Sequence, residues 1–207
     1  MKVLMINGSP RKNGSTSTVF KEMEKVFHEL SIETEIIYIP HDTSSCMACG
    51  YCHKNNECVK KDIVNETYSK LDEADGIIVG SPVYYANPNG SLISFLDRLF
   101  YSYPNAALLN MKAGASIAIA RRSGNLTSND VLTKFFSING MSIITSTYWN
   151  DPHGSNADSV VKDEEGMQTA RNLARNMAYY LMMRKLAADN NLNEPEIERG
   201  KFTNFIR

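Results

Sequence analysis

The chain has 207 residues, of which 43% are hydrophobic and 22% are charged, as in an ordinary globular domain. Its 22 basic and 23 acidic residues give a formal charge of -1, which argues against nucleic acid or an anionic membrane as a partner. The sequence has no apolar run of the about 18 residues that a membrane span needs, and its amino-terminal apolar stretch is too short for a signal peptide. We therefore expect a cytoplasmic protein.

The first half of the sequence alternates short apolar runs with segments of helical spacing. Residues 2–6 predict a strand that ends at the turn sequence NGSP, and apolar residues then recur at helical spacing over 20–30. The β-branched run 34–39 predicts a second strand, and residues 63–71 predict a helix. Residues 76–80 predict a third strand, apolar enough to be buried on both faces as parallel strands are.

The second half continues the alternation. Apolar residues at helical spacing predict helices over 92–99 and 131–136, and residues 115–120 between them predict a fourth strand. Residues 141–147 predict a fifth strand, and residues 167–186 carry the longest helical pattern in the chain.

Strands that alternate with helices in this way predict an α/β fold, a three-layer sandwich with helices on both faces of a five-stranded parallel sheet. The expected strand order is 2-1-3-4-5, in which ligands bind at the carboxyl ends of the strands near the switch between the first and third. We assign residues 1–188 to this domain, with a cysteine-rich loop at 46–58, and residues 189–207 to a C-terminal tail at an oligomer interface.

The loop after the first strand, NGSPRKNGSTST at 7–18, is rich in hydroxyl groups and precedes a helix. The start of a helix offers unpaired backbone N–H groups and a partial positive charge, so a terminal phosphate fits there. The side chains that complete such a pocket are Ser9, Arg11, Ser15, Thr16 and Ser17. The spacing matches neither a dinucleotide fingerprint nor a P-loop, so a monophosphate is expected. Alternatively, Ser15 or Thr16 only caps the helix.

The loop after the third strand, GSPVYYANPNG at 80–90, places Val83, Tyr84 and Tyr85 where a buried strand ends. These side chains predict a stiff apolar wall on which a planar tricyclic ring would be buried. The alternative is that the tyrosines serve packing or a subunit contact. After the fourth strand, Arg122, Ser123 and Gly124 supply donors and a glycine facing the same crevice, although arginines at strand ends are usually solvated.

All four cysteines of the chain lie in the loop after the second strand, at Cys46, Cys49, Cys52 and Cys58. In a reducing compartment such clustering argues for a metal or redox site rather than disulfides. Compact runs of four cysteines commonly hold iron-sulfur clusters. Tetrahedral zinc and free thiols retained for packing remain alternatives.

The motifs NGSPR and GST in the first loop, followed by GSPVYY at 80–85, resemble the NADPH-dependent FMN reductase group of the flavodoxin-like superfamily. The resemblance implies that Ser9, Arg11 and residues 15–17 bind the FMN phosphate. It also implies that the residues of the second motif flank the isoalloxazine ring, namely Pro82, Val83, Tyr84, Tyr85 and Ala86. The match of Arg122, Ser123 and Gly124 to the third flavin loop is loose, and His153 is interpreted as a satisfied loop histidine rather than a catalytic group.

The cysteine spacing resembles the iron-sulfur flavoprotein branch of the same superfamily. This resemblance implies that Cys46, Cys49, Cys52 and Cys58 bind a 4Fe-4S cluster that exchanges electrons with FMN. We expect the cysteine loop to lie on the rim of the same crevice as the flavin loops.

These observations predict an oxidoreductase in which NADPH, NADH or a protein donor reduces FMN, which passes electrons to a small-molecule or protein acceptor. The alternatives are a cluster-free NAD(P)H-dependent FMN or quinone reductase, a flavodoxin-like electron carrier, and a zinc-bearing redox-responsive regulator. The family resemblance also implies a homodimer or homotetramer, and the loops and the tail carry more aromatic surface than one domain needs. The residues concerned are Tyr84, Tyr101, Tyr103, Phe202, Phe205 and Ile206.

Overall fold

The computed structural model describes residues 1–198, 200, 201 and 203, and its core is a parallel sheet. The strands run in the order β2-β1-β3-β5-β6, which is the predicted order 2-1-3-4-5 because the short strand β4 lies outside the parallel series. β4 pairs in antiparallel fashion with the end of β3. The strand bounds are β1 Lys2–Asn7, β2 Glu33–Tyr38, β3 Gly76–Tyr84, β4 Asn87–Pro88, β5 Ala113–Ile119 and β6 Ser142–Ile143.

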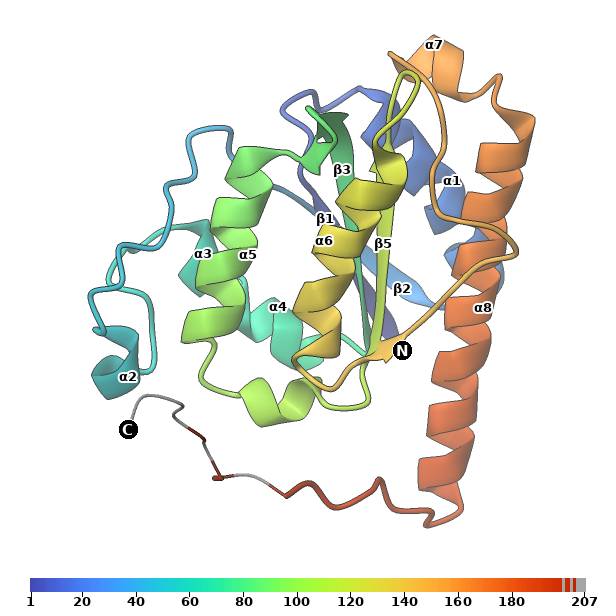
Figure 1. The fold of residues 1–207 in the computed structure, drawn as a ribbon. Coiled ribbons are helices and arrows are strands. Elements are labelled where there is room, and N and C mark those ends of the chain that lie inside the picture. Colours follow the sequence, from blue (N-terminus) through green and yellow to red (C-terminus); the bar gives the residue numbers. More distant parts are fainter. Residues whose placement is uncertain (199, 202, 204–207) are drawn as a thin grey trace.

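Helices cover both faces of the sheet, so the predicted three-layer α/β fold is confirmed (Figure 1). One apolar cluster joins alternate strand residues to α1 and α8, and a second cluster joins the other strand residues to α4, α5 and α6. The helix bounds are α1 Ser15–Glu29, α2 Cys52–Asn55, α3 Ile63–Glu66, α4 Tyr68–Glu73, α5 Gly90–Ser102, α6 Asn125–Ser137, α7 Ala157–Val160 and α8 Glu164–Asp189, with a 3-10 turn η1 at Ala106–Leu109.

The sheet register brings the ligand-facing ends of the central strands together. Asn7 at the end of β1 pairs with Gly80, and Pro82 in β3 pairs with Ile119 at the end of β5. The loops that follow β1, β3 and β5 therefore leave the sheet at the same edge, as the doubly wound order requires.

The fifth strand is much shorter than predicted. Only Ser142–Ile143 forms β6, after which the chain leaves the sheet and returns as a single parallel bridge between Ala120 and His153. Side-chain amides take up part of the missing ladder, because Asn150 Nδ2 donates to Ser116 O (3.0 Å) and Asn125 Nδ2 donates to Ala118 O (3.2 Å). The apolar pattern of the sequence does not indicate where side-chain amides replace backbone hydrogen bonds in this way.

Two further expectations are corrected. The helix predicted over 63–71 is two short helices, α3 and α4, separated by Thr67. Tyr103 is buried, not a surface aromatic group, and its hydroxyl donates to Asp72 Oδ1 (2.5 Å). Of the tail residues invoked for oligomerisation, Phe202, Phe205 and Ile206 lie outside the described residues.

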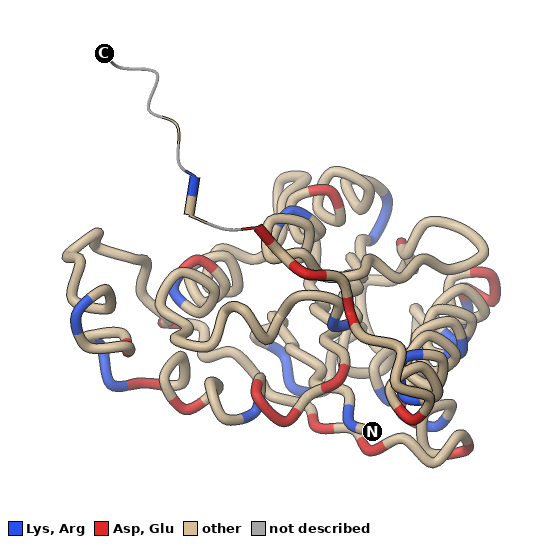
Figure 2. The backbone as a smooth tube through the Cα atoms, turned by 90° about the horizontal axis from the view of Figure 1, so that it is seen from below, with Lys and Arg blue, Asp and Glu red and all other residues tan. Residues whose placement is uncertain are grey.

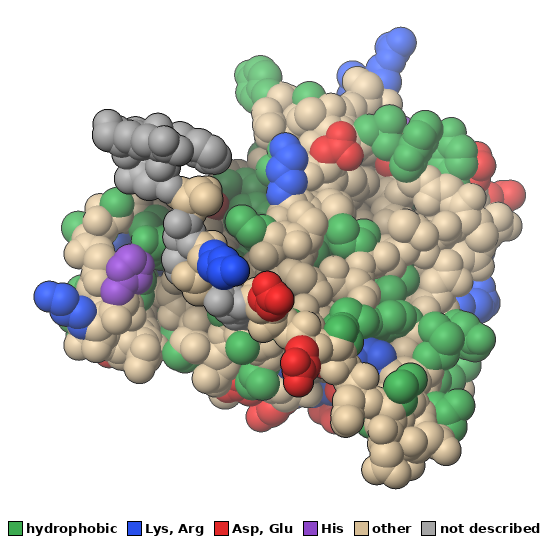
Figure 3. Space-filling view, turned by 60° about the horizontal axis from the view of Figure 1, so that its bottom comes forward, with side chains coloured by type: hydrophobic (Ala, Val, Ile, Leu, Met, Phe, Trp, Pro, Cys, Tyr) green, Lys and Arg blue, Asp and Glu red, His purple; other side chains and the backbone are tan. Residues whose placement is uncertain are grey.

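Charges of both signs are scattered around the backbone rather than gathered by sign on one side (Figure 2). Hydrophobic side chains gather on the side of the molecule that carries α8 and the segment after β6 (Figure 3). The exposed apolar residues of these segments are Tyr148, Trp149, Tyr179, Met182, Met183 and Leu186, and Ile143 at the end of β6 is exposed beside them in sequence. No helix in the described part of the chain is both long and apolar enough to cross a bilayer.

Candidate functional site

An open pocket of about 290 Å³ lies at the carboxyl ends of the strands, and all three predicted loops contribute to it. This volume is near the lower end of the range for small-molecule sites. Two cations, Arg11 and Arg121, line the pocket, and among the described residues no carboxylate does. The other lining residues are Ser9, Gly14, Ser15, Thr16, Pro82, Val83, Tyr84, Ile119, Gly154 and Ser155.

The amino terminus of α1 opens toward this pocket. Gly14 is the N-cap residue, and among the described side chains none caps it. The Ser15 hydroxyl donates instead to Gly154 O (3.3 Å), and Thr16 is buried, so neither residue acts as the N-cap. The first N–H groups of α1 are thus free to bind an anion, and the partial charge of the helix favours one there.

Asn7 and Ser9 fix the shape of the loop after β1. The buried Asn7 side chain accepts a hydrogen bond from Ser9 N (2.9 Å) and donates to Ser17 Oγ (3.0 Å). Ser9 Oγ in turn accepts from Arg11 N (3.2 Å). Ser17 therefore holds the loop against β1 and lies outside the pocket lining, whereas Ser9 and Arg11 lie in it.

The apolar wall is built on a β-hairpin. β3 continues to Tyr84 and turns back to β4 through Tyr85 and Ala86, which have φ angles of 50° and 58°. Positive φ at both central residues is the geometry of a type I′ turn, which usually favours glycine or asparagine. Pro82, Val83 and Tyr84 line the pocket, while Tyr85 projects into solvent and Ala86 packs against the loop after β5.

The loop after β5 approaches the hairpin at Gly124. A Cβ atom on this residue would lie 2.8 Å from Ala86 Cα, and its φ of 96° is itself unfavourable for other residues. Arg121 rather than Arg122 lines the pocket, and Arg122 and Ser123 are exposed outside the lining. Four further residues line the pocket that the sequence did not predict, namely Ile119, Arg121, Gly154 and Ser155. The strand bridge between Ala120 and His153 brings Gly154 and Ser155 there.

The four cysteines line a second, separate cavity. All four are free thiols, and the cavity is completed by Arg98, Tyr101 and Ser102 of α5 and by neighbouring loop residues. Its enclosed space of about 20 Å³ holds roughly one water molecule, so a cluster requires outward movement of the loop. Cys46 and Cys49 are exposed in a segment without helix or strand, which permits that movement.

The donor set of this cavity fits a cluster. Four cysteine thiolates are the ligand set of a 4Fe-4S cluster, in which each cysteine binds a different iron atom. The four sulfur atoms therefore do not have to converge on one metal ion. Within the described residues, no three His, Cys, Asp or Glu side chains converge closely enough to hold a single metal ion.

The buried cation Arg98 lines the cysteine cavity together with Lys60. Burial lowers its pKa, but hydrogen bonds to Asp62 and Cys58 outweigh burial and hold that pKa above its ordinary value. Burial likewise acts to raise the pKa of Asp62, and the bonds from Arg98 and Val64 N bring it below its usual range. Both groups are therefore charged at neutral pH.

The two cavities do not share a rim, contrary to the expectation from sequence. Their lining residues have no member in common, and the cysteine cavity lies against the C-terminal half of α5. Figure 1 shows α2 at the lower left of the molecule, while α7 and the loops after β1 and β3 lie at the top.

The fold defines a flavodoxin-like α/β protein with a pocket at the switch between β1 and β3. Residues 1–156 match the model of the NADPH-dependent FMN reductase family, and the chain belongs to this family.

Two relatives carry the name iron-sulfur flavoprotein. One, from Methanocaldococcus jannaschii, is 33% identical over 185 residues, which cover 86% of this chain and 96% of the relative. The other, from Methanosarcina thermophila, is 31% identical over 183 residues, with coverage of 86% and 93%. The solved structure of RosB with bound 8-demethyl-8-formylriboflavin-5′-phosphate superposes with a TM-score of 0.67 at 14% identity, covering 100% of this chain and 94% of that one. That likeness shows the fold.

Proposed function

We propose that this protein is an FMN-dependent oxidoreductase of the iron-sulfur flavoprotein type. The observation that carries the proposal is that one pocket joins the uncapped start of α1 and the cation Arg11 to the apolar residues Pro82, Val83 and Tyr84. A phosphate needs the first half of this pocket and a planar apolar ring needs the second. FMN has both parts.

Different residues of the pocket bind the phosphate and the ring of FMN. The N–H groups at the start of α1, with Ser9, Arg11, Ser15 and Thr16, hold the phosphate, and residues 82–84 pack against the ring. Arg121 adds a second cation. When bound, FMN supplies the redox chemistry, so the chain binds and orients it and needs no acid-base side chain for hydride uptake. NADPH, NADH or a reduced protein is the donor, and a small molecule or protein is the acceptor.

Cys46, Cys49, Cys52 and Cys58 would hold a 4Fe-4S cluster in the second cavity. When bound, such a cluster supplies one-electron exchange. The names of the two relatives and the set of four free thiols support this part of the proposal. We extend the proposal to a homodimer or homotetramer, which the exposed apolar side chains of α8 and of the segment after β6 support.

The test is purification without oxygen, followed by an absorption spectrum and by measurement of flavin, iron and sulfide per chain. We expect FMN, about four irons and four sulfides, and oxidation of NADPH or NADH when a dye acceptor is present. A Cys58→Ser variant should lose iron and keep FMN, and a Ser45→Ala variant of the same cavity should keep both. Equal affinity for FMN and FAD, or flavin without iron, would contradict the respective part of the proposal.

A further inference from the structure

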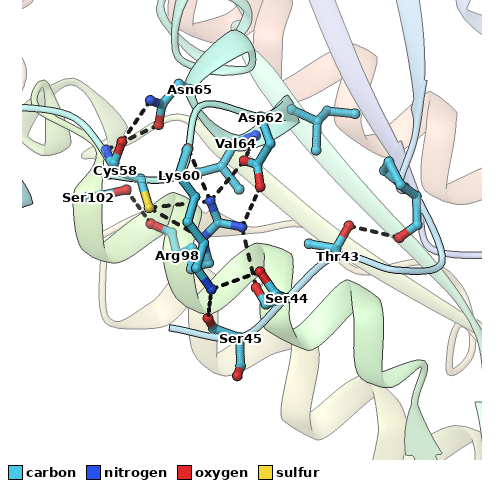
Figure 4. A network of polar contacts seen from close by, with 12 residues as sticks. Thr43, Ser44, Ser45, Cys58, Lys60, Asp62, Val64, Asn65, Arg98 and Ser102 are labelled. Atoms are coloured by element: carbon cyan, nitrogen blue, oxygen red, sulfur yellow. Dashed lines mark hydrogen bonds and ion pairs between the residues drawn. The ribbon is translucent and has the colours of Figure 1, made fainter. Parts of the chain in front are cut away.

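Arg98 is the bulkiest fully buried side chain in the described part of the chain, and apart from Ser102 the other buried residues of its helix, α5, are apolar. Its side chain is 1% exposed. Two of its nitrogens face the Cys58 sulfur, with Nε at 3.4 Å and Nη2 at 3.3 Å (Figure 4). Burying a charged guanidinium costs free energy unless the charge is paired and hydrogen-bonded, and a thiol does not supply the opposite charge. Arg98 therefore requires an anionic partner.

Asp62 is that partner. Its carboxylate accepts from Arg98 Nη1 and Nη2, each at 2.8 Å, in a bidentate pair that fixes the plane of the guanidinium. The same carboxylate accepts from Val64 N (3.1 Å) as the N-cap of α3, so the carboxylate is itself held in place. The charge of Arg98 is therefore largely balanced, and what remains for Cys58 is a pair of directed N–H donors.

Cys58 differs from the other three cysteines in how it is held. Its backbone N–H donates to Asn65 Oδ1 (3.1 Å) and to the Tyr68 hydroxyl (3.2 Å), and its carbonyl accepts from Asn65 Nδ2 (2.9 Å). Cys46 and Cys49 lie exposed on the opposite part of the loop. The Cys58 thiol is thus preorganised by its neighbours before any cluster is present, whereas Cys46 and Cys49 lie in an exposed segment without helix or strand.

We propose that Arg98 is a positioning residue that orients the Cys58 sulfur and, through its N–H donors, raises the reduction potential of the cluster. This inference rests on the proposed binding of a cluster by the four cysteines. Hydrogen bonds to ligand sulfurs favour the reduced, more negative form of an iron-sulfur centre. Because Asp62 balances the charge of Arg98, the effect arises from directed donors rather than from net charge.

If Arg98 had only a structural role, its replacement would have a different measurable effect. Arg98 Nη1 also contacts Ser44 O (3.3 Å) and Nη2 contacts Lys60 O (3.4 Å), so the side chain joins the two ends of the cysteine loop to α5. If this were its whole contribution, replacement would lower stability and leave the potential of a loaded cluster unchanged. The potential therefore separates the two roles.

The experiment uses the full chain, reconstituted with iron and sulfide without oxygen, as the parent and as Arg98→Lys, Arg98→Gln and Lys54→Gln variants. Arg98→Lys keeps the charge and loses the planar fork, and it remains testable if Arg98→Gln fails to fold. Lys54 is exposed on α2, two residues after Cys52, so its replacement removes one nearby charge without removing an N–H donor to Cys58. Iron and sulfide content, thermal unfolding and the cluster midpoint potential by electron paramagnetic resonance are measured for each.

We expect both Arg98 variants to shift the one-electron equilibrium about tenfold toward the oxidised cluster, the size of one charge-assisted hydrogen bond. For a one-electron couple this is about 59 mV more negative. Lys54→Gln should shift the midpoint potential of the cluster less than either Arg98 variant does. Arg98→Lys with a loaded cluster at the parental potential would overturn the inference. A parent that binds no iron would instead refute the proposed cluster itself.

Discussion

At the scale of single residues, Arg11 and Thr16 contribute to the phosphate end of the flavin pocket in different ways. Arg11 is exposed and offers a charge, whereas Thr16 is buried and offers shape, since its methyl group packs where a Cβ on Gly80 would lie. The phosphate end therefore depends on charge at Arg11 and on the open helix start, while Thr16 both lines the pocket and packs against Gly80.

Arg11→Ala should weaken FMN binding by about 1.5 to 3 kcal/mol, the scale of a lost hydrogen bond to a charged group. Lys12→Ala is the matched control, because Lys12 is the adjacent exposed cation and does not line the pocket. Titration calorimetry of the flavin-free protein with FMN measures both. Equal affinities of the two variants would place the phosphate elsewhere.

Gly124→Ala should destabilise the protein by about 1 to 3 kcal/mol, because φ is 96° there and the new methyl group would meet Ala86. Gly90→Ala at the start of α5 is the contrast, since a Cβ there has open space, and it should be neutral or stabilising by about 0.5 to 1 kcal/mol. Urea unfolding of the two variants gives both values. Equal decreases in the free energy of unfolding for both variants would mean that the contact between Gly124 and the hairpin does not cause the destabilisation.

At the scale of elements, the sequence predicts β1, β3 and β5 well because these central parallel strands are continuous apolar runs, and it predicts the edge strand β2 from its β-branched residues. It fails at β6, where Asn125 and Asn150 replace ladder hydrogen bonds with side-chain amides. It also gives no sign of Arg98, since a cation among apolar residues of a helix ordinarily faces solvent. Its burial depends on Asp62, which lies 36 residues earlier in the chain, and such pairing is not encoded in a local pattern.

An ion network joins β2 to β1 and α4. Glu35 in β2 contacts Lys2 (2.8 Å) and Lys70, and these partners lower the pKa of Glu35 below its ordinary 4.5 against the opposing effect of burial. A lowered folded-state pKa stabilises the fold above the unfolded-state value and loses this contribution as the pH falls through the folded-state pKa.

Glu35→Gln should therefore lower the free energy of unfolding by about 0.5 to 1 kcal/mol at pH 7, and the difference from the parent should disappear as the pH falls through the lowered folded-state pKa of Glu35. Chemical unfolding across this range measures the difference. A gap that persists undiminished at acid pH would assign the loss to packing and not to charge.

At the scale of the whole molecule, α8 presents an apolar stripe to solvent. Tyr179, Met183 and Leu186 recur at helical spacing and are 66%, 44% and 65% exposed. Neighbours at this spacing share one face of a helix. Together with the exposed aromatic pair Tyr148 and Trp149, they form the surface that we expect to associate with a second copy of the chain.

Met183→Glu together with Leu186→Glu should shift the protein toward a single chain of 23.2 kDa, because two charges would be buried in the expected interface. Leu108→Glu is the control, since Leu108 is 52% exposed on η1, away from α8. Light scattering at micromolar concentration gives the masses. A parent that already scatters as one chain would refute association.

The segment after β6 carries Trp149, which is the only tryptophan of the chain and lies 59% exposed. Its indole sits edge-on to Tyr148, at 5.0 Å between ring centres, at the margin of the apolar surface. Five residues later the same segment supplies Gly154 to the flavin pocket. Since isoalloxazine absorbs where indole emits, this single fluorophore serves as an optical reporter: energy transfer would quench it when flavin binds, and burial would shift its emission to the blue when chains associate.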